Sequence, residues 1–377
     1  MHFFYQLFRE EIINFIRARF HLVYKTSNTQ TPIWLQHYQP PPWALYRRSI
    51  SQAVNMVDID IIEPIDAVIT WVNGGDDSHR IKRKHYIELS DEPLHKNAVN
   101  PHRWICNDEI FYCLKSIENH APWTRKIWIV VDNITPDLSR LSDFLQSKVH
   151  IAYHHEIFVG FEDMLPTFNS LAIESMLWRI DGLAERFIYF NDDVFLTAPL
   201  APQDVFVGQK PVLRGEWADY SHLEHDTAQQ DNPAKFNHYM QINAAKMMGF
   251  SASRLFNAAH VIHPFLRSRM EQLFTDHPKA LRANISYQFR DLRQFLPQGL
   301  HNHASICNAQ AIFHKDNDHL HIHSGQGNGR PAEEVWALLY PVTKTNDIKM
   351  LCINDLPQLK TLIPDVDTWL SQAIGGF

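Results

Sequence analysis

The chain has 377 residues, of which 45% are hydrophobic and 20% are charged, and its formal net charge is -7. This composition is that of an ordinary globular protein, long enough for one large domain or two smaller ones. The negative balance argues against a nucleic-acid-binding surface, which depends on clustered lysine and arginine.

Residues 1–57 form a segment of their own. Apolar residues recur there at roughly helical spacing between arginines, and the run Pro40-Pro41-Pro42 follows. The pattern predicts a helical extension, either docked on the main body or lying as a basic amphipathic helix on a membrane surface or on partner proteins. Charged residues interrupt its apolar start, and no apolar run reaches the roughly 20 residues of a membrane span, so we expect a cytoplasmic protein. Four cysteines without a C-x2-C pair agree with a reduced environment.

Strands and helices alternate in the next segment, residues 58–234. The sequence predicts strands at 65–72, 126–131, 149–153 and 186–190, and helices that begin at Asn107 or Asp108 and at Asn169 or Ser170. This order predicts an α/β fold with a mainly parallel sheet flanked by helices. Ligands of such sheets bind beyond the carboxyl ends of the strands.

The pattern becomes more helical in residues 235–377. We expect helices over 235–248 and 254–274 and a strand over 319–323. The sequence thus predicts three parts: the extension, an α/β core at 58–234, and a helical and mixed region at 235–377 that completes the active site.

Asp192 and Asp193 follow the apolar strand 186–190 directly. Two adjacent carboxylates at a strand end are costly unless a cation lies beside them, and Mg²⁺ commonly joins protein carboxylates to substrate phosphates. The alternative is a solvated turn, because Asn-Asp-Asp is also a turn sequence.

A second turn, Asn73-Gly74-Gly75-Asp76, ends the strand 65–72. Its glycines would let backbone N–H groups approach a phosphate closely. An ordinary tight turn explains the same residues.

Histidines and arginines give weaker signals. His260 and His263 would share one face if their segment were helical, and His319, His321 and His323 would share one face of a strand, which suggests Zn²⁺ or simply a polar strand face. Arg290 has the side chain that usually holds phosphate oxygens, although an exposed, ion-paired arginine is the default interpretation and nothing in the local sequence overturns it.

Four segments, in order along residues 63–356, resemble the Stealth family of sugar-1-phosphate transferases, which act in bacterial capsule synthesis and in Golgi tagging of lysosomal enzymes. The segments are 65–74 with its Trp71-Val72-Asn73-Gly74 turn, 107–193, 259–290 and 352–355. The sequence departs from the family pattern at Gly75, where serine is frequent, and at Leu356, where a second acidic residue is frequent.

The resemblance implies a core like that of nucleotide-sugar (GT-A-like) transferases, a UDP-sugar donor and a divalent cation, Mg²⁺ or Mn²⁺. It places Asn191, Asp192, His260 and Arg290 in the catalytic group. Asp192 and Asp193 are the expected metal ligands, and the expected substrate-binding residues are Asn73, Gly74, Asp76, Arg125, Asn169 and Ser170.

The expected function is a capsular polysaccharide phosphotransferase that moves a hexose-1-phosphate, with N-acetylhexosamine as the sugar, from a UDP-sugar such as UDP-GlcNAc to a sugar hydroxyl and releases UMP. Its expected partners are a UDP-hexosamine, an oligosaccharide or growing capsule acceptor, capsule-assembly proteins and the inner membrane surface. Two alternatives are a metal-dependent glycosyltransferase that releases UDP and a non-enzymatic carbohydrate-binding protein of capsule assembly.

Overall fold

The computed structural model describes residues 63–105, 107–322 and 330–377. Glu63–Phe377 forms one compact unit. The expected extension over 1–57 and the third histidine of the alternating run, His323, lie outside the described residues. Within the described residues, no helix combines the length and the apolar character that crossing a membrane requires.

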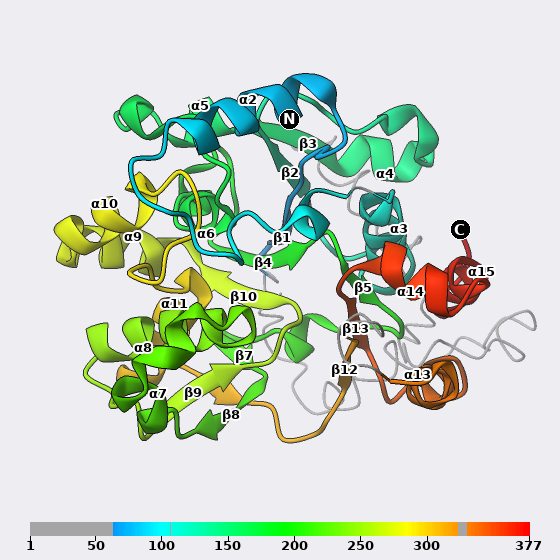
Figure 1. Cartoon of the computed structure of the whole chain (residues 1–377). Coiled ribbons are helices and arrows are strands. Elements are labelled where there is room, and N and C mark those ends of the chain that lie inside the picture. The colour runs from blue at the N-terminus through cyan, green and yellow to red at the C-terminus, as the bar shows by residue number, and fades with distance from the viewer. Residues whose placement is uncertain (1–62, 106, 323–329) are drawn as a thin grey trace, which may run out of the picture. The chain divides into compact units, whose positions relative to one another are not determined.

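A five-stranded sheet in the order β10-β4-β1-β2-β3 lies at the centre of the protein (Figure 1). The four parallel strands are β1 (Ile65–Thr70), β2 (Ile127–Val131), β3 (Val149–Tyr153) and β4 (Arg186–Asn191), and β10 (His263–Leu266) pairs antiparallel with β4. The predicted α/β class with a mainly parallel sheet is confirmed. Each of the four predicted strands of the core is present.

Successive side chains of a strand point to opposite faces of the sheet, and each face is covered by its own apolar cluster. Ile69 of β1 packs in one apolar cluster with α3 (Glu109–His120), whereas its neighbour Val68 packs in a second cluster with α10 (Pro278–Ser286) and α11 (Pro297–Cys307). Burial on both faces explains why the parallel strands read as continuous apolar runs.

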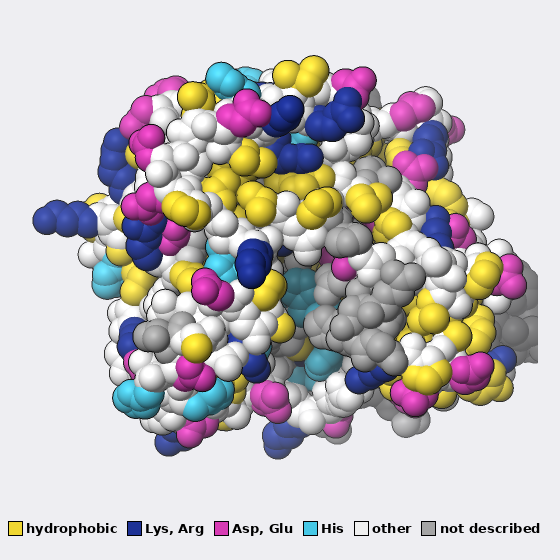
Figure 2. All heavy atoms as spheres, in the orientation of Figure 1, with side chains coloured by type: hydrophobic (Ala, Val, Ile, Leu, Met, Phe, Trp, Pro, Cys, Tyr) yellow, Lys and Arg dark blue, Asp and Glu magenta, His cyan; other side chains and the backbone are white. Residues whose placement is uncertain are grey.

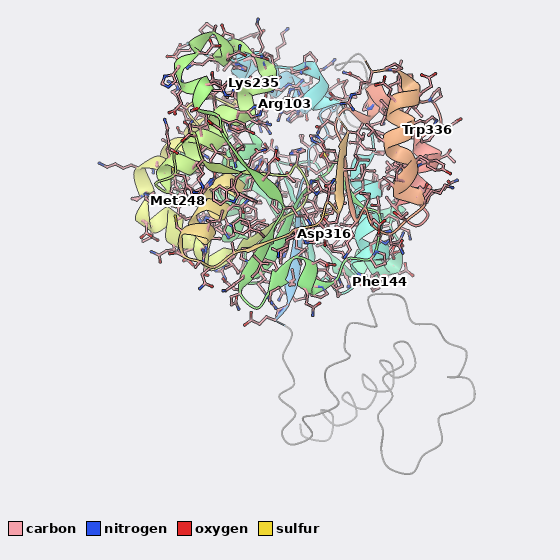
Figure 3. All side chains as sticks on the ribbon, turned by 90° about the horizontal axis from the view of Figure 1, so that it is seen from below. Arg103, Phe144, Lys235, Met248, Asp316 and Trp336 are labelled. Carbon is pink, nitrogen blue, oxygen red and sulfur yellow. The ribbon has the colours of Figure 1, made fainter. Side chains whose placement is uncertain are left out.

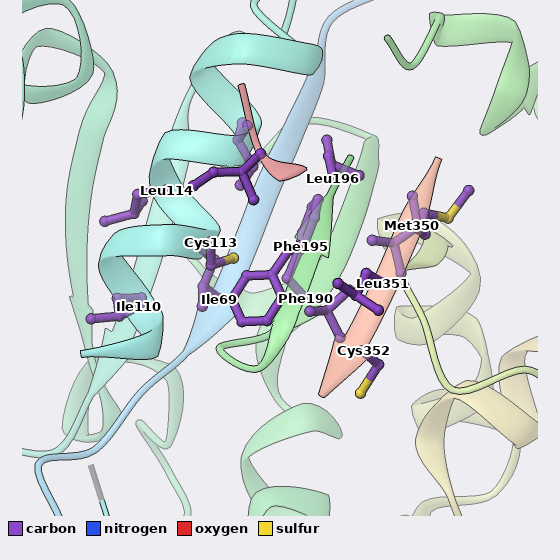
Figure 4. Packing of buried hydrophobic residues seen from close by; sticks show 14 of the residues in the cluster. Ile69, Ile110, Cys113, Leu114, Phe190, Phe195, Leu196, Met350, Leu351 and Cys352 are labelled. Carbon is purple, nitrogen blue, oxygen red and sulfur yellow. The ribbon is translucent and has the colours of Figure 1, made fainter. Parts of the chain in front are cut away.

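A small three-stranded sheet extends the first cluster. Its order is β12 (His319–Ile322), β13 (Met350–Ile353) and β5 (Val194–Leu196), and Figure 4 shows side chains of β5, β13 and α3 packed together. β5 follows β4 after only Asp192 and Asp193. The small sheet therefore brings residues 319–322 and 350–353 next to the end of a central strand.

The helix starts agree with the sequence in position but not always in mechanism. Asn169 caps α6 (Ser170–Glu174) by accepting a hydrogen bond from the backbone N–H of Leu171 at 3.1 Å. Asp108 precedes α3 with a positive φ of 64° and makes no side-chain cap, because its carboxylate accepts from Arg140 at 2.8 Å. Helix α6 is short and ends at Glu174.

The predicted helix over 254–274 is wrong in its first half. That stretch contains β9 (Leu255–Ala258), paired with β8 (Gly215–Ala218), and then β10, and only α9 (Arg267–Asp276) is helical. Phe265 of β10 stacks on Phe187 of β4 with ring centroids 5.3 Å apart. Strand pairing and this packing outweigh the helical spacing of the apolar residues.

The remaining elements complete the coverage of the sheets. The predicted helix over 235–248 is present as α8 (Phe236–Met247). The other elements are α2 (Asp77–Glu88), α4 (Asp143–Lys148), α5 (His154–Ile157), β6 (Phe206–Val207), β7 (Lys210–Leu213), α7 (Ser221–His225), β11 (Ile312–Phe313), α13 (Ala332–Leu339), α14 (Leu356–Leu362) and α15 (Val366–Ala373). β10 lies beyond residue 234 in the sequence but belongs to the sheet formed by residues 65–191. The domain boundary predicted at residue 234 stays a prediction.

Candidate active site

A cavity of about 990 Å³ opens at the carboxyl ends of the central strands. Its walls include Thr70 at the end of β1, Asn191 at the end of β4, His260 before β10 and His321 on β12. Figure 2 shows the hollow near the centre of this face, with histidine side chains inside it. This volume is at the upper end of the roughly 300–1,000 Å³ that is typical of small-molecule sites.

The acidic wall of the cavity is the turn between β4 and β5. Burial raises the pKa of Asp192 well above its usual range, and the neighbouring charges of Asp193 and Glu109 raise it further. Burial also raises the pKa of Asp193. Oδ2 of Asp193 accepts a hydrogen bond from Nδ2 of Asn354 at 2.8 Å, whereas Oδ1 is buried without a hydrogen-bond partner among the described residues. Two crowded carboxylates with an unsatisfied oxygen form a site suited to a cation.

Arg290 supplies positive charge to the cavity wall. Its Nη2 donates to Oγ of Ser170 at 2.5 Å, and its buried Nε has no hydrogen-bond partner among the described residues. Burial lowers the pKa of Arg290, and the nearby carboxylate of Glu174 opposes that shift. A half-buried arginine at a cavity wall whose Nε is left without a partner among the described residues is suited to binding an anion.

Asn169 lies beneath Arg290 and is fully buried. Its side-chain Nδ2 donates to the carbonyl of Tyr287 and to Oε1 of Gln294, both at 2.9 Å. With its Oδ1 capping α6, the amide holds the segment that carries Arg290. Asn169 lines the cavity, but its polar atoms are used inside the protein, so the structure gives it a positioning role.

The histidine pair is not on a helix. His263 lies on β10, and burial lowers its pKa to about 3, so the side chain is neutral. His260 precedes the strand and lines the cavity, with its ring centroid 4.9 Å from that of His321. His319 and His321 of the alternating run both line the cavity from β12. The structure therefore brings together histidines from two distant segments.

The turn at residues 73–76, which follows β1, differs from the phosphate-binding turn that the sequence suggested. The N–H of Gly74 donates to the carbonyl of Val72 at 3.1 Å, and the N–H of Gly75 donates to Oδ1 of Asn73 at 3.2 Å. Both groups are used within the turn and offer no donor to a phosphate.

The residues of this turn have structural roles. A Cβ on Gly74 would lie 2.2 Å from the carbonyl oxygen of Trp104, so glycine permits this close packing. Asp76 caps α2 by accepting from the N–H of His79 at 3.0 Å. Neither Gly74 nor Asp76 lines the cavity, and Asn73 lines an adjoining, smaller one of about 300 Å³ that shares Trp71 and Asp132 with it.

Arg125 does not line either cavity. Its guanidinium makes a two-point ion pair with Asp66, with Nε and Nη2 at 2.8 and 2.6 Å from the two carboxylate oxygens. Asp66 lies on β1 and is fully buried. This ion pair holds the sheet, and the expected substrate-binding role of Arg125 stays a prediction.

Two family models match the chain. Stealth protein CR1, conserved region 1, matches residues 63–91, and Stealth protein CR2, conserved region 2, matches residues 83–212. The chain carries conserved regions 1 and 2 of the Stealth family. The resemblance inferred from the four sequence segments is confirmed for this part of the chain. Conserved region 2 supplies Asp192 and Asp193, whereas His260 and Arg290 lie beyond both matched regions.

The curated relatives have consistent names. An exopolysaccharide phosphotransferase of Streptomyces coelicolor is 30% identical over 270 residues, which are 70% of this chain and 44% of that protein. A capsular polysaccharide phosphotransferase of Haemophilus influenzae is 42% identical over 143 residues, 38% of each chain. The chain spans less than half the length of these relatives.

The solved glycosyltransferase structures that match this protein are only distantly similar to it in structure and sequence. A galactosyltransferase LgtC in complex with donor and acceptor sugar analogues has a TM-score of 0.37 and 12% identity, covering 81% of this chain and 99% of that chain. Mouse xyloside xylosyltransferase 1 also has a TM-score of 0.37 and 12% identity, covering 77% and 97%. These scores are too low to support an argument about activity, and the fold class rests on the sheet itself.

Two further residues of Stealth conserved region 2 line the cavity and were not predicted. Glu174 is 5% exposed, and its pKa is raised to about 7, chiefly by burial. Arg103 lies in the short helix Pro101–Trp104. Its guanidinium interacts electrostatically with Arg290 and with the carboxylates of Asp193 and Glu174. Figure 3 shows Arg103 on the same side of the protein as Lys235.

Glu174 and Arg103 were missed in the sequence analysis for different reasons. Glu174 left a signal in the sequence, because it is the one acidic residue in the otherwise apolar and small helix Ser170–Glu174. Nothing local distinguishes Arg103 from a surface arginine, because its place depends on where the loop after α2 folds.

Proposed function

We propose that this protein transfers a hexose-1-phosphate, with N-acetylhexosamine as the sugar, from a UDP-sugar to a sugar hydroxyl and so builds a phosphodiester-linked capsule polymer. The observation that carries the proposal is the single cavity that joins Asp192 and Asp193 to His260 and Arg290. The names of the relatives, exopolysaccharide and capsular polysaccharide phosphotransferase, support the same chemistry.

In the proposed reaction the acceptor hydroxyl oxygen attacks the β-phosphorus of the donor. A new phosphorus–oxygen bond forms, the bond to the bridging oxygen of the diphosphate breaks, and UMP leaves. The hydroxyl proton passes to a base. The bond between the donor sugar and its phosphate survives, so the anomeric configuration is retained. Such a transfer needs an in-line nucleophile and groups that offset the phosphate charge.

A divalent cation, Mg²⁺ or Mn²⁺, fits the acidic wall. Asp192 and Asp193 would hold it, because burial and the neighbouring charge of Asp193 keep the pKa of Asp192 high, and Oδ1 of Asp193 lacks a hydrogen-bond partner among the described residues. When bound, such an ion neutralises charge on the diphosphate. Hard oxygen ligands are those that these cations prefer.

The protein's own groups have separate tasks in this proposal. Arg290 binds the phosphoryl oxygens with the guanidinium edge that Ser170 leaves unused. His260 accepts the proton of the acceptor hydroxyl, because Asp192 would serve as a ligand of the cation. Asn191 orients the β-phosphate or the acceptor, with its Oδ1 fixed by the hydroxyl of Tyr189 at 2.8 Å.

Identification of the released nucleotide tests the proposal. The purified chain is incubated with UDP-N-acetylhexosamines, Mg²⁺ or Mn²⁺, and capsule oligosaccharides, and the products are examined for UMP and for a phosphodiester. UMP with a phosphodiester is the expected result. UDP would instead indicate glycosyl transfer, and no nucleotide would indicate a binding protein.

Asp192→Asn should abolish release of the nucleotide. Asp163→Asn is the matched control, since Asp163 lies outside the cavity with a side chain 66% exposed and paired with Arg282. Equal loss in both variants would mean that the acidic wall is not the reacting site.

A further inference from the structure

Two histidines of the cavity wall and a buried cysteine behind them form a second group of metal-binding atoms, beside the acidic wall. His260, His321 and Cys352 each offer one ligand atom, and these three atoms lie within 4.8 Å of one another. None of the three belongs to the pair Asp192 and Asp193. Two imidazole nitrogens and a sulfur are soft or borderline ligands, whereas the acidic wall offers only hard oxygens. The two groups therefore suit different ions.

Strand pairing fixes two members of the group. β12 and β13 are parallel, and His321 is the register partner of Cys352, so their side chains are neighbours on one face of the small sheet. Cys352 is fully buried and unoxidised, and His321 is half-buried at the cavity wall. His260 approaches from the segment before β10, with its ring 4.9 Å from that of His321. The sulfur lies inside the protein and the two imidazoles face the cavity.

A hydrogen-bond chain orients His321. Nε2 of His321 donates to Oδ1 of Asn354 at 2.5 Å, and Nδ2 of Asn354 donates to Oδ2 of Asp193 at 2.8 Å. With its proton on Nε2, the imidazole carries its lone pair on Nδ1. Metal-binding histidines are commonly fixed in this way through their second nitrogen. These two hydrogen bonds also connect His321 to Asp193 of the acidic wall.

We propose that His260, His321 and Cys352 bind a transition-metal ion of the Zn²⁺ type, and that this ion inhibits the transferase by occupying His260. Ligand atoms around tetrahedral Zn²⁺, at bond lengths of about 2.0–2.3 Å, lie roughly 3.3–3.8 Å apart, so small rotations of the imidazoles close the set. On binding, the Cys352 thiol releases its proton to solvent and the sulfur takes the metal. The fourth position faces the cavity and takes water.

Cobalt is the probe for the site, because a Co²⁺–thiolate bond gives a charge-transfer absorption that oxygen and nitrogen ligands do not give. The full chain is treated with a chelator, freed of it, and titrated with Co²⁺. We expect the near-ultraviolet band to saturate at one equivalent and to disappear on addition of Zn²⁺. A wild-type protein without the band would overturn the proposal.

Three variants locate the site. Cys352→Ser should lose the band, and Asn354→Ala should weaken Co²⁺ binding by roughly 10- to 100-fold, as expected when the partner of a ligand is removed. Cys113→Ser is the matched control, because Cys113 is also fully buried and belongs to the same apolar cluster on α3, as Figure 4 shows. The band should persist in Cys113→Ser. If it persists in Cys352→Ser, the proposed ligand set is wrong.

His321→Gln keeps the test decisive if Cys352→Ser fails to fold. His321 is half-buried at the cavity wall, so its replacement disturbs less packing, and it should still weaken Co²⁺ binding. Unchanged affinity in folded His321→Gln would overturn the assignment.

The inhibitory role rests on the proposed function, whereas the cobalt spectrum does not. With Mg²⁺ in excess, one equivalent of Zn²⁺ should suppress UMP release by the wild-type protein. Full activity of the zinc-loaded protein would overturn the inhibition and leave the metal site in place. A protein that shows the cobalt band but never releases UMP would retain the site and refute the proposed function.

Discussion

Replacement of Glu174 by glutamine should change how the stability of the protein depends on pH. The carboxyl is 5% exposed in the cavity wall, and burial raises its pKa from 4.5 to about 7, against the opposing charge of Arg290. Between these two values the native state binds a proton that the unfolded state has released. The free energy of unfolding therefore falls as the pH rises from 4.5 to 7 and is constant, as far as this group is concerned, above that. At about 1.4 kcal/mol per pKa unit, the loss reaches about 3 kcal/mol by pH 8.

Urea unfolding at pH 4.5 and pH 8 measures this effect. Glutamine does not titrate, so the stability of the wild type relative to Glu174→Gln should fall by about 3 kcal/mol between the two pH values. Glu88→Gln is the matched control, because the Glu88 side chain is 63% exposed on α2, and its stability should follow that of the wild type. Parallel curves for wild type and Glu174→Gln would refute the reasoning, since the buried carboxyl would then titrate alike in both states.

Three further outcomes are expected. Excess EDTA should abolish UMP release and Mg²⁺ or Mn²⁺ should restore it, whereas full activity in EDTA would remove the cation from the proposal. Asp192→Asn, His260→Ala and Arg290→Ala should each lower kcat by roughly 100-fold or more with an unchanged melting temperature, and a near-normal kcat in folded His260→Ala would remove it as the base. Arg125→Ala should lower the free energy of unfolding by about 1–2 kcal/mol, because Asp66 loses its counter-charge but keeps hydrogen bonds from the backbone N–H groups of Lys126 and Ala184, while kcat stays near the wild-type value. A lower kcat in that variant, with little change in stability, would restore Arg125 to substrate binding.

The central strands were predictable because burial on both faces makes them continuous apolar runs. The end of β4 at Asn191 places Asp192 and Asp193 at the cavity, as the rule for parallel sheets predicts. The second half of the chain was less predictable. His263 and its neighbours read as helical, yet they form an edge strand because β4 offers an unpaired side. Such pairing depends on partners about 75 residues away in the sequence, which local spacing does not show.

The soft ligand group shows the same limit more sharply. His321 was visible as part of an alternating strand, and Cys352 stood alone without a motif. Their neighbourhood comes from the register of β12 against β13, and a shift by one residue would turn Cys352 to the opposite face. The spacing of residues in a sequence can indicate a set of metal ligands only when a single helix, strand or loop carries all of them.

The buried amide of Asn169 explains how conserved-region residues can control a group that lies outside those regions. Arg290 lies beyond conserved region 2, but Asn169 and Ser170 lie within it. Asn169 bonds to Tyr287 and Gln294 on either side of Arg290, and Ser170 accepts directly from the guanidinium. Because these contacts fix both the backbone and the side chain, the first turn of α6 sets where the positive charge lies. A motif that is interpreted as substrate-binding from the sequence can thus act by placing an arginine at the cavity wall.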